Sequence, residues 1–167
     1  MKAPGEHHLD AAEGWLSLGL TKEAMDELAK VPMATRRHFK YLSIMWQALC
    51  QQCEWEDALL FANRCTQRFP DRVESWLALA ETLEKLPPPI GGYLAAWDVL
   101  RSRVDHFPND GRMAIKLASY AISLDRPRQA NEWFSMALQQ LNKSNLDHLL
   151  KEDQELLKLM EEIPFES

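Results

Sequence analysis

The chain has few of the features that mark an enzyme, a secreted scaffold or a membrane protein. It contains only 3 cysteines and 6 glycines among 167 residues, and it has no phosphate-binding glycine loop, G-x-S-x-G or H-E-x-x-H motif. No apolar run approaches the ~18 residues that a membrane span requires. The first residues lack the apolar core of a secretory signal, so with so few cysteines we expect a reducing, cytoplasmic location.

Positive charge is also scarce. The chain has 19 Lys and Arg against 25 Asp and Glu, which gives a formal net charge of -6. Nucleic acid is therefore not an expected partner, because nonspecific phosphate binding requires a basic surface and the run Arg36-Arg37-His38 is too short to form one. The carboxylates, as in residues 152–155, suit a solvated helix face better than a paired acid and base. We expect no catalytic site.

The chain does contain a repeat. Four alanines recur at intervals of 34, 38 and 34 residues: Ala24, Ala58, Ala96 and Ala130. Two further series recur every 34 residues: Trp15, Leu49 and Leu83, and Ala12, Trp46 and Ala80. Self-similarity at this period is typical of helical solenoids.

Alanine suits such a position for steric reasons. Two helices approach to the usual 8 to 10 Å only where small side chains occupy the crossing. Larger apolar residues three or four positions away lie on the same face and fill the space beside the crossing. Since one hairpin cannot bury that face alone, its neighbours must stack on it, and an elongated domain is expected.

The repeat resembles the tetratricopeptide repeat family, whose unit reads W-x2-L-G-x2-Y, then A-x3-F, then P. In the third unit Trp76 and Ala80 take the Trp and Gly positions, and Leu83 takes the Tyr position; in the fourth, Ala130 and Phe134 match A-x3-F. The resemblance implies an all-α, right-handed α-solenoid of about four helical hairpins that forms one domain over residues 1–167. Its units would span about 5–38, 39–72, 73–110 and 111–144.

Turn residues fit these units. Gly19 suits a helix end, Thr21 is a candidate N-cap, and Pro127 suits the first turn of a helix. The four extra residues of the 38-residue interval are assigned to the turn Pro87–Gly92, where three prolines exclude helix. This turn is a second candidate contact surface, formed by Pro87, Pro88, Pro89, Ile90 and Tyr93.

The resemblance also implies a concave surface lined by the first helix of each unit. The family register assigns the following residues to this groove: Glu6, Leu9, Glu13, Lys40, Ser43, Gln47, Glu74, Leu77, Glu81, Glu84, Arg112, Ile115 and Ser119. Its acidic middle and apolar spots predict a basic or amphipathic protein or peptide partner, although a solvated groove without a ligand remains an alternative. A carboxylate clamp like that of some family members is not expected, because Leu9, Glu13, Ser43 and Gln47 occupy its positions.

Cys50 and Cys53 form a C-x-x-C pair, which can be redox-active or half of a zinc site. Cys53 corresponds in register to Gly19, so we interpret the pair as structural and expect no metal or cofactor. A metal- or thiol-dependent regulatory protein that uses Cys50 and Cys53 is the alternative. His7 and His8 are adjacent in a helix and point to different faces, which disfavours chelation.

Six tryptophans are predicted to pack between helices. The register directly supports this for Trp15, Trp46 and Trp76. Interface anchoring is the alternative for Trp55, Trp97 and Trp133.

A further helix is expected over about 145–163, because Ser144 can cap it and leucines recur along one side. We expect it to cap the stack, with a dimer interface as the alternative. The protein would accordingly be a monomer or a homodimer, and a self-associating structural protein is a further possibility.

Overall fold

The computed structural model describes residues 5–140, and within this range the chain is helical and contains no strand. The eight α-helices and two short 3-10 helices are α1 (Glu6–Ser17), α2 (Thr21–Lys30), η1 (Thr35–Arg37), α3 (Phe39–Gln51), α4 (Trp55–Arg68), α5 (Val73–Lys85), α6 (Tyr93–Arg101), η2 (Val104–His106), α7 (Gly111–Ser123) and α8 (Pro127–Gln140). The predicted all-α helical repeat is confirmed. The helix expected near 145–163 lies outside the described residues.

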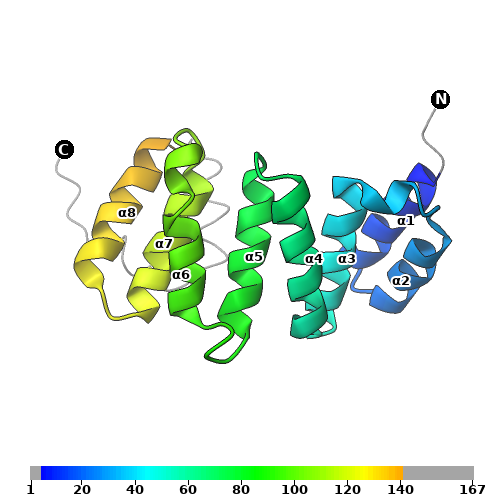
Figure 1. The fold of residues 1–167 in the computed structure, drawn as a ribbon, viewed down its shortest axis with the longest axis horizontal. Helices are drawn as coiled ribbons and strands as arrows, with labels where there is room; N and C mark the ends of the chain where they lie inside the picture. The colour runs from blue at the N-terminus through cyan, green and yellow to red at the C-terminus, as the bar shows by residue number, and fades with distance from the viewer. Residues whose placement is uncertain (1–4, 141–167) are drawn as a thin grey trace.

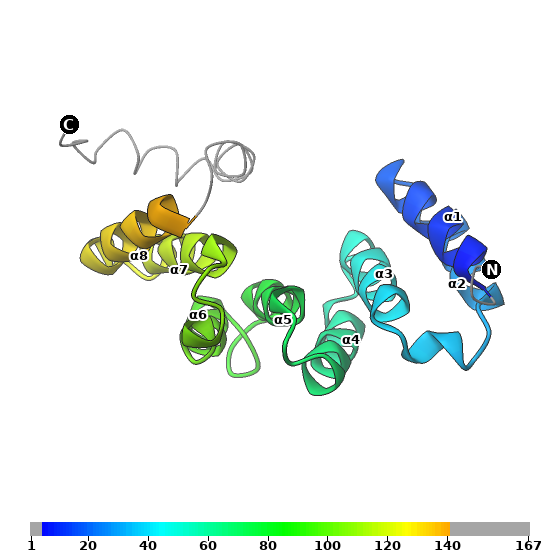
Figure 2. The same ribbon diagram turned by 90° about the horizontal axis from the view of Figure 1, so that it is seen from above.

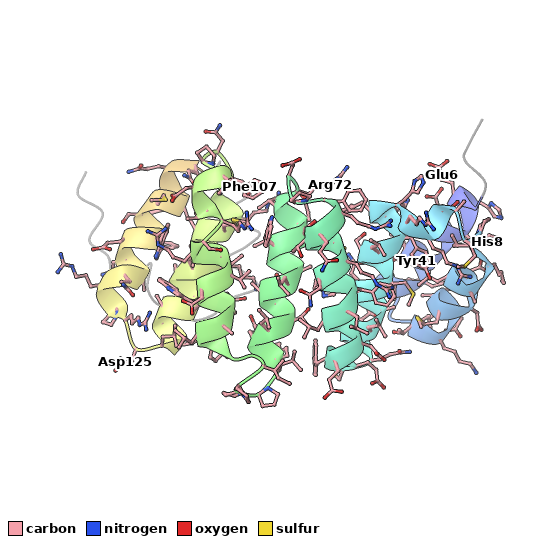
Figure 3. The ribbon with its side chains drawn as sticks, viewed as in Figure 1. Glu6, His8, Tyr41, Arg72, Phe107 and Asp125 are labelled. Atoms are coloured by element: carbon pink, nitrogen blue, oxygen red, sulfur yellow. The ribbon has the colours of Figure 1, made fainter. Side chains whose placement is uncertain are left out.

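The α-helices form four hairpins that stack side by side along the long axis of the molecule (Figure 1), and from above the stack curves into an arc (Figure 2). Viewed from above, α1, α3, α5 and α7 lie on the inner side of the arc, and α2, α4 and α6 lie on the outer side (Figure 2). Turns within hairpins and connections between hairpins lie on opposite edges. Asp125 marks the first edge, and Arg72 and Phe107 mark the second (Figure 3).

The alanine series lies inside the hairpins. Ala24, Ala58, Ala96 and Ala130 each have 0% of their surface exposed. Each belongs to the second helix of its hairpin, as the period predicts. Their burial agrees with the steric role of alanine at a helix crossing.

Helix α4 joins two parts of the hydrophobic core. Its Cys65 packs in a cluster with Leu28 and Ile44 from the first two hairpins. Its Ala62 packs in a second cluster that continues through Trp76 to α8. The core is therefore extended along the arc, as expected for stacked repeats.

Three hairpins close with the same backbone geometry. The residues Gly19, Cys53 and Asp125 have φ angles of 73°, 59° and 56°, in the left-handed region. In each hairpin the next residue donates its N–H to the carbonyl five positions earlier, at 2.9, 3.0 and 2.8 Å. This is the Schellman arrangement, and it shows why Cys53 corresponds to a glycine.

The third hairpin makes the same closure over four more residues. The N–H of Gly92 donates to the carbonyl of Leu83 at 2.7 Å, so the inserted residues loop out between the two ends. The predicted position of the insertion is thus confirmed. A Cβ on Gly91 would lie 2.4 Å from the oxygen of Leu83, which leaves no room for a side chain there.

Two local predictions are wrong. Thr21 does not cap α2: the N-cap is Leu20, and the Thr21 hydroxyl donates to the Gln51 side chain at 2.7 Å. Trp15 is 37% exposed instead of packed between helices. Leu49, at the corresponding position, is buried because α3 has a hairpin on either side, whereas α1 is the first described helix of the stack.

The other tryptophans are buried or half-buried. Trp76 and Trp97 are buried, and the ring of Trp133 meets Trp97 edge to face with centroids 6.2 Å apart. Trp46 and Trp55 are half-buried. Packing therefore accounts for most of the aromatic content, although Trp46 also lines the candidate site.

Candidate functional site

Most of the predicted groove residues have at least partly exposed side chains, but two do not. Leu9 and Ile115 are each only 3% exposed. Leu9 packs in the core of the first two hairpins, and Ile115 packs in a cluster that contains Phe134. These two residues belong to the core, so the prediction that they line the groove surface is corrected.

A pocket of about 250 Å³ opens between α3 and α5. It is lined by Phe39, Ser43, Trp46, Gln47, Cys65, Glu74, Leu77, Ala78 and Glu81. The structure thus brings five of the predicted groove residues together: Ser43, Gln47, Glu74, Leu77 and Glu81. The remaining members of the predicted set lie along α1, on the rest of α3 and α5, and on α7.

Trp46 forms part of the wall of this α3–α5 pocket and is held by a hydrogen bond. Its indole N–H donates to the Thr82 hydroxyl at 2.8 Å, and that hydroxyl donates to the Ala78 carbonyl at 2.8 Å. Thr82 has no exposed surface. Because the polar atom of the indole is satisfied inside the protein, the apolar ring is fixed at the pocket. The repeat register predicts only a packing role for Trp46, although a tryptophan at the glycine position of the repeat is itself unusual and marks this residue.

The two carboxylates beside the pocket are engaged by α7. Glu74 accepts a hydrogen bond from Arg112 at 3.0 Å, and Glu81 lies 3.4 Å from the Lys116 amine. Arg112 also contacts Asp110 at 2.6 Å. Burial favours a higher pKa for Asp110, but the hydrogen bonds and charge of Arg112 outweigh it and lower that pKa.

A similar ion pair joins α1 to α3. The Lys40 amine lies 2.6 Å from Asp10 and 3.2 Å from Glu13. The hydrogen bond to Asp10 is the main cause of the raised pKa of Lys40. The predicted groove residues Glu13 and Lys40 are therefore paired with each other at the surface, and Lys40 also pairs with Asp10.

A second pocket, of about 270 Å³, lies next to the first and is lined by Trp46, Cys50, Trp55, Glu81, Glu84, Lys85 and Lys116. Burial, with a contribution from Glu81, raises the pKa of the Cys50 thiol to about 12. Cys50 is therefore protonated at neutral pH, and nucleophilic or metal-binding chemistry requires the thiolate. Cys53 is exposed.

The rings of the adjacent His7 and His8 lie with their centroids 3.9 Å apart, so the prediction that they point to different helix faces is wrong. His8 pairs through Nδ1 with Glu27 at 2.6 Å. Between residues 5 and 140, no group of three or more His, Cys, Asp or Glu side chains is placed to hold a metal ion. No described helix is long and apolar enough to cross a bilayer.

The inserted turn presents apolar side chains to solvent. Pro87, Pro88 and Pro89 are exposed, Ile90 is 58% exposed and Tyr93 is 43% exposed. The ring of Tyr93 also lies 6.1 Å from that of the buried Tyr120. The turn is thus accessible and is anchored beside α7.

Comparison with known proteins gives a likeness in fold. No family model matches the sequence, and no curated protein is significantly similar to it. Two solved structures described as MamA are similar, with TM-scores of 0.67 and 0.64 at 15% and 16% sequence identity. They cover 81% and 83% of this chain, which covers 77% and 74% of theirs.

A third structure, described as MamA MSR-1 C2, has a TM-score of 0.60 at 18% identity. The similar region covers 95% of this chain and 89% of that structure's chain. At these identities the likeness concerns the fold alone. The protein shares the helical-repeat architecture of the MamA structures.

Proposed function

We propose that the protein is a protein-binding scaffold whose inner face captures an extended or helical segment of a partner, with one apolar side chain of that segment in the α3–α5 pocket. The observation that carries this proposal is the position of the pocket. It lies at the middle of the inner face, and ion pairs bridge the flanking α1–α3 and α5–α7 junctions.

The lining of the pocket defines the partner. Trp46, Leu77 and Phe39 supply apolar surface, while Glu74 and Glu81 supply the charged rim. The partner segment is therefore amphipathic, with a bulky apolar residue beside a lysine or arginine. The basic side chain exchanges for Arg112 or Lys116 at the carboxylates, so this contact sets specificity more than affinity.

Selection from a display library of short random peptides tests the proposal. Wild-type protein is expected to enrich peptides in which a bulky apolar residue neighbours a basic one. Gln47 is exposed at the pocket, so Gln47→Arg places a charge there without disturbing the core. We expect this variant to bind the selected peptides with an affinity lower by about tenfold or more. Gln139→Arg, on the exposed surface of α8, is the matched control and is expected to bind as wild type.

Two results would overturn the proposal. One is that selected peptides bind Gln47→Arg and wild type equally. The other is that Gln139→Arg weakens binding as much as Gln47→Arg does. Thermal unfolding of both variants shows that a loss of binding is not a loss of fold.

A further inference from the structure

A different surface lies on the outer side of the arc, where the first hairpin passes to the second. Here η1 forms part of the connection from α2 to α3 and packs against α3 (Figure 2). A concavity of about 440 Å³ opens between η1, α3 and α4 and is lined by Met33, Arg36, Arg37, Tyr41, Leu42, Phe61, Arg64 and Arg68. We call these eight residues the arginine pocket.

The four arginines of this pocket are not neutralised by carboxylates. None of them forms an ion pair with any acidic residue between positions 5 and 140. The inner face differs, since Lys40, Arg112 and Lys116 each contact a carboxylate there. In a chain with a formal net charge of -6, the arginine pocket is a local concentration of positive charge.

Two of the four guanidinium groups are held in place by backbone carbonyls. Arg36 donates to the carbonyls of Val31 and Ala29 at 2.8 and 2.7 Å. Arg68 donates to the carbonyl of Arg37 at 3.3 Å. Carbonyl contacts orient a guanidinium without cancelling its charge, so these donors are pre-organised for an anion.

Aromatic rings complete the pocket. The Arg36 guanidinium lies 5.8 Å from the centre of the Tyr41 ring, and that of Arg64 lies 5.1 Å from the Phe61 ring. Tyr41 is buried against the core, whereas Met33 is 75% exposed at the margin. The site therefore combines apolar contact surface with charged donors.

From this combination we infer that the arginine pocket binds an acidic segment of a partner protein, in which Asp or Glu residues flank one apolar side chain. Carboxylates match the planar guanidinium through paired hydrogen bonds, and the apolar side chain packs against Met33 and Phe61. A nucleic acid matches less well, because its phosphates continue beyond the four arginines and meet a chain of net negative charge.

The sequence alone conceals this pocket because two distant segments build it. Arg36 and Arg37 come from η1, and Arg64 and Arg68 are one turn apart on α4. Each pair is too short to mark a basic tract. Only the stacking of the second hairpin on η1 brings the four side chains together.

The test is a fluorescence-anisotropy titration with a labelled peptide in which Glu and Asp surround a central Phe. A matched peptide carries Gln and Asn in their place. We expect the acidic peptide to bind, the neutral peptide not to bind, and the affinity to fall as salt is raised from about 0.1 M to about 1 M. Binding that is equal for both peptides would overturn the proposal.

Variants locate the binding. The double variant Arg37→Glu/Arg64→Glu reverses two exposed charges and spares Arg36, which holds the end of α2; we expect affinity to fall by at least about tenfold. The control Arg126→Glu/Arg128→Glu makes the same charge change on exposed residues near the start of α8 and is expected to retain binding. Equal losses in both variants, or none in the first, contradict the inference.

Two further controls separate the possible outcomes. Gln47→Arg, at the inner face, should leave the acidic peptide unaffected, so failure of one site does not imply failure of the other. Single-stranded DNA is the competitor: if it displaces the peptide and binds the arginine pocket more tightly than the peptide does, the protein partner is wrong.

Discussion

The middle junction of the inner face is built differently from those on either side of it. Lys40 pairs with Asp10 between α1 and α3, and Lys116 pairs with Glu81 between α5 and α7. Between α3 and α5 the indole of Trp46 donates a hydrogen bond to the buried Thr82 hydroxyl, and a pocket opens beside it.

The difference shows how a repeat protein can leave one place open. Exposed ion pairs contribute about 1 kcal/mol or less each, but they occupy the charges of two neighbouring helices. The hydrogen bond from the half-buried indole to the buried Thr82 hydroxyl fixes the contact between α3 and α5 without using a surface charge. The middle junction therefore combines a fixed contact between Trp46 and Thr82 with an accessible apolar pocket wall.

The largest effect on the free energy of unfolding is expected when the Trp46 indole is removed. Trp46→Ala deletes the indole and leaves a cavity between α3 and α5, so we expect a loss of about 3 kcal/mol in the free energy of unfolding. Urea unfolding followed by circular dichroism measures it. Lys40→Ala, at the α1–α3 junction, is the comparison and should cost about 1 kcal/mol or less. Equal costs would remove the distinction between the junctions.

The inserted turn supports the end of α5, which forms one side of the middle junction. Gly91→Ala would place a Cβ 2.4 Å from the Leu83 oxygen, and we expect a loss of about 2 kcal/mol. Gly14→Ala is the matched control, because a Cβ at Gly14 in α1 meets no atom within 4 Å. Alanine favours helix there, so the control should gain about 0.5 to 1 kcal/mol. The same sign for both variants would contradict this account of the turn.

The hydrogen bond of the middle junction can be removed alone. Thr82→Val keeps the shape of the side chain but leaves the Trp46 N–H without its acceptor. We expect this change to lower the free energy of unfolding by about 1 to 2 kcal/mol. Thr66→Val is the control, since the Thr66 hydroxyl donates only to the Asn63 carbonyl of its own helix. Thermal unfolding should place Thr82→Val below Thr66→Val; the reverse order would show that the junction does not depend on this bond.

The smallest effect is expected at an ion pair. Lys116→Met removes the amine that lies 3.4 Å from Glu81. We expect it to lower the free energy of unfolding by at most about 1 kcal/mol at low salt. Because screening weakens exposed pairs, the difference from wild type should shrink towards zero near 1 M salt. A difference that persists at high salt would mean that Lys116 acts through packing instead of charge.

The regular parts of the fold could be predicted from the sequence because the period carries them. The alanine intervals placed the second helix of each hairpin, and the 38-residue interval placed the insertion at Pro87–Gly92. The register predicts that Cys53 corresponds to Gly19, and both residues adopt the left-handed conformation. These features depend on the spacing of residues along the chain, which can be seen in a single sequence.

Which side chains of the inner face are exposed depends on contacts between units, and the repeat register does not predict these contacts. It assigned Leu9 and Ile115 to the surface, yet both are buried. One signal for the ion pairs was present: Glu74 and Arg112 have opposite charges and are 38 residues apart, one period including the insertion. A tryptophan at the glycine position marks Trp46 in the sequence, but the orientation of its indole cannot be predicted there, because it depends on Thr82 of the next unit.

The most direct test of the central claim is a titration of the protein with a selected peptide, followed through the indole N–H resonances of its tryptophans. Single Trp→Phe variants assign the signals. The α3–α5 pocket predicts that the Trp46 resonance shifts in proportion to the bound fraction, while that of Trp133, on α8, stays in place. A shift of Trp133 without a shift of Trp46 would contradict the claim.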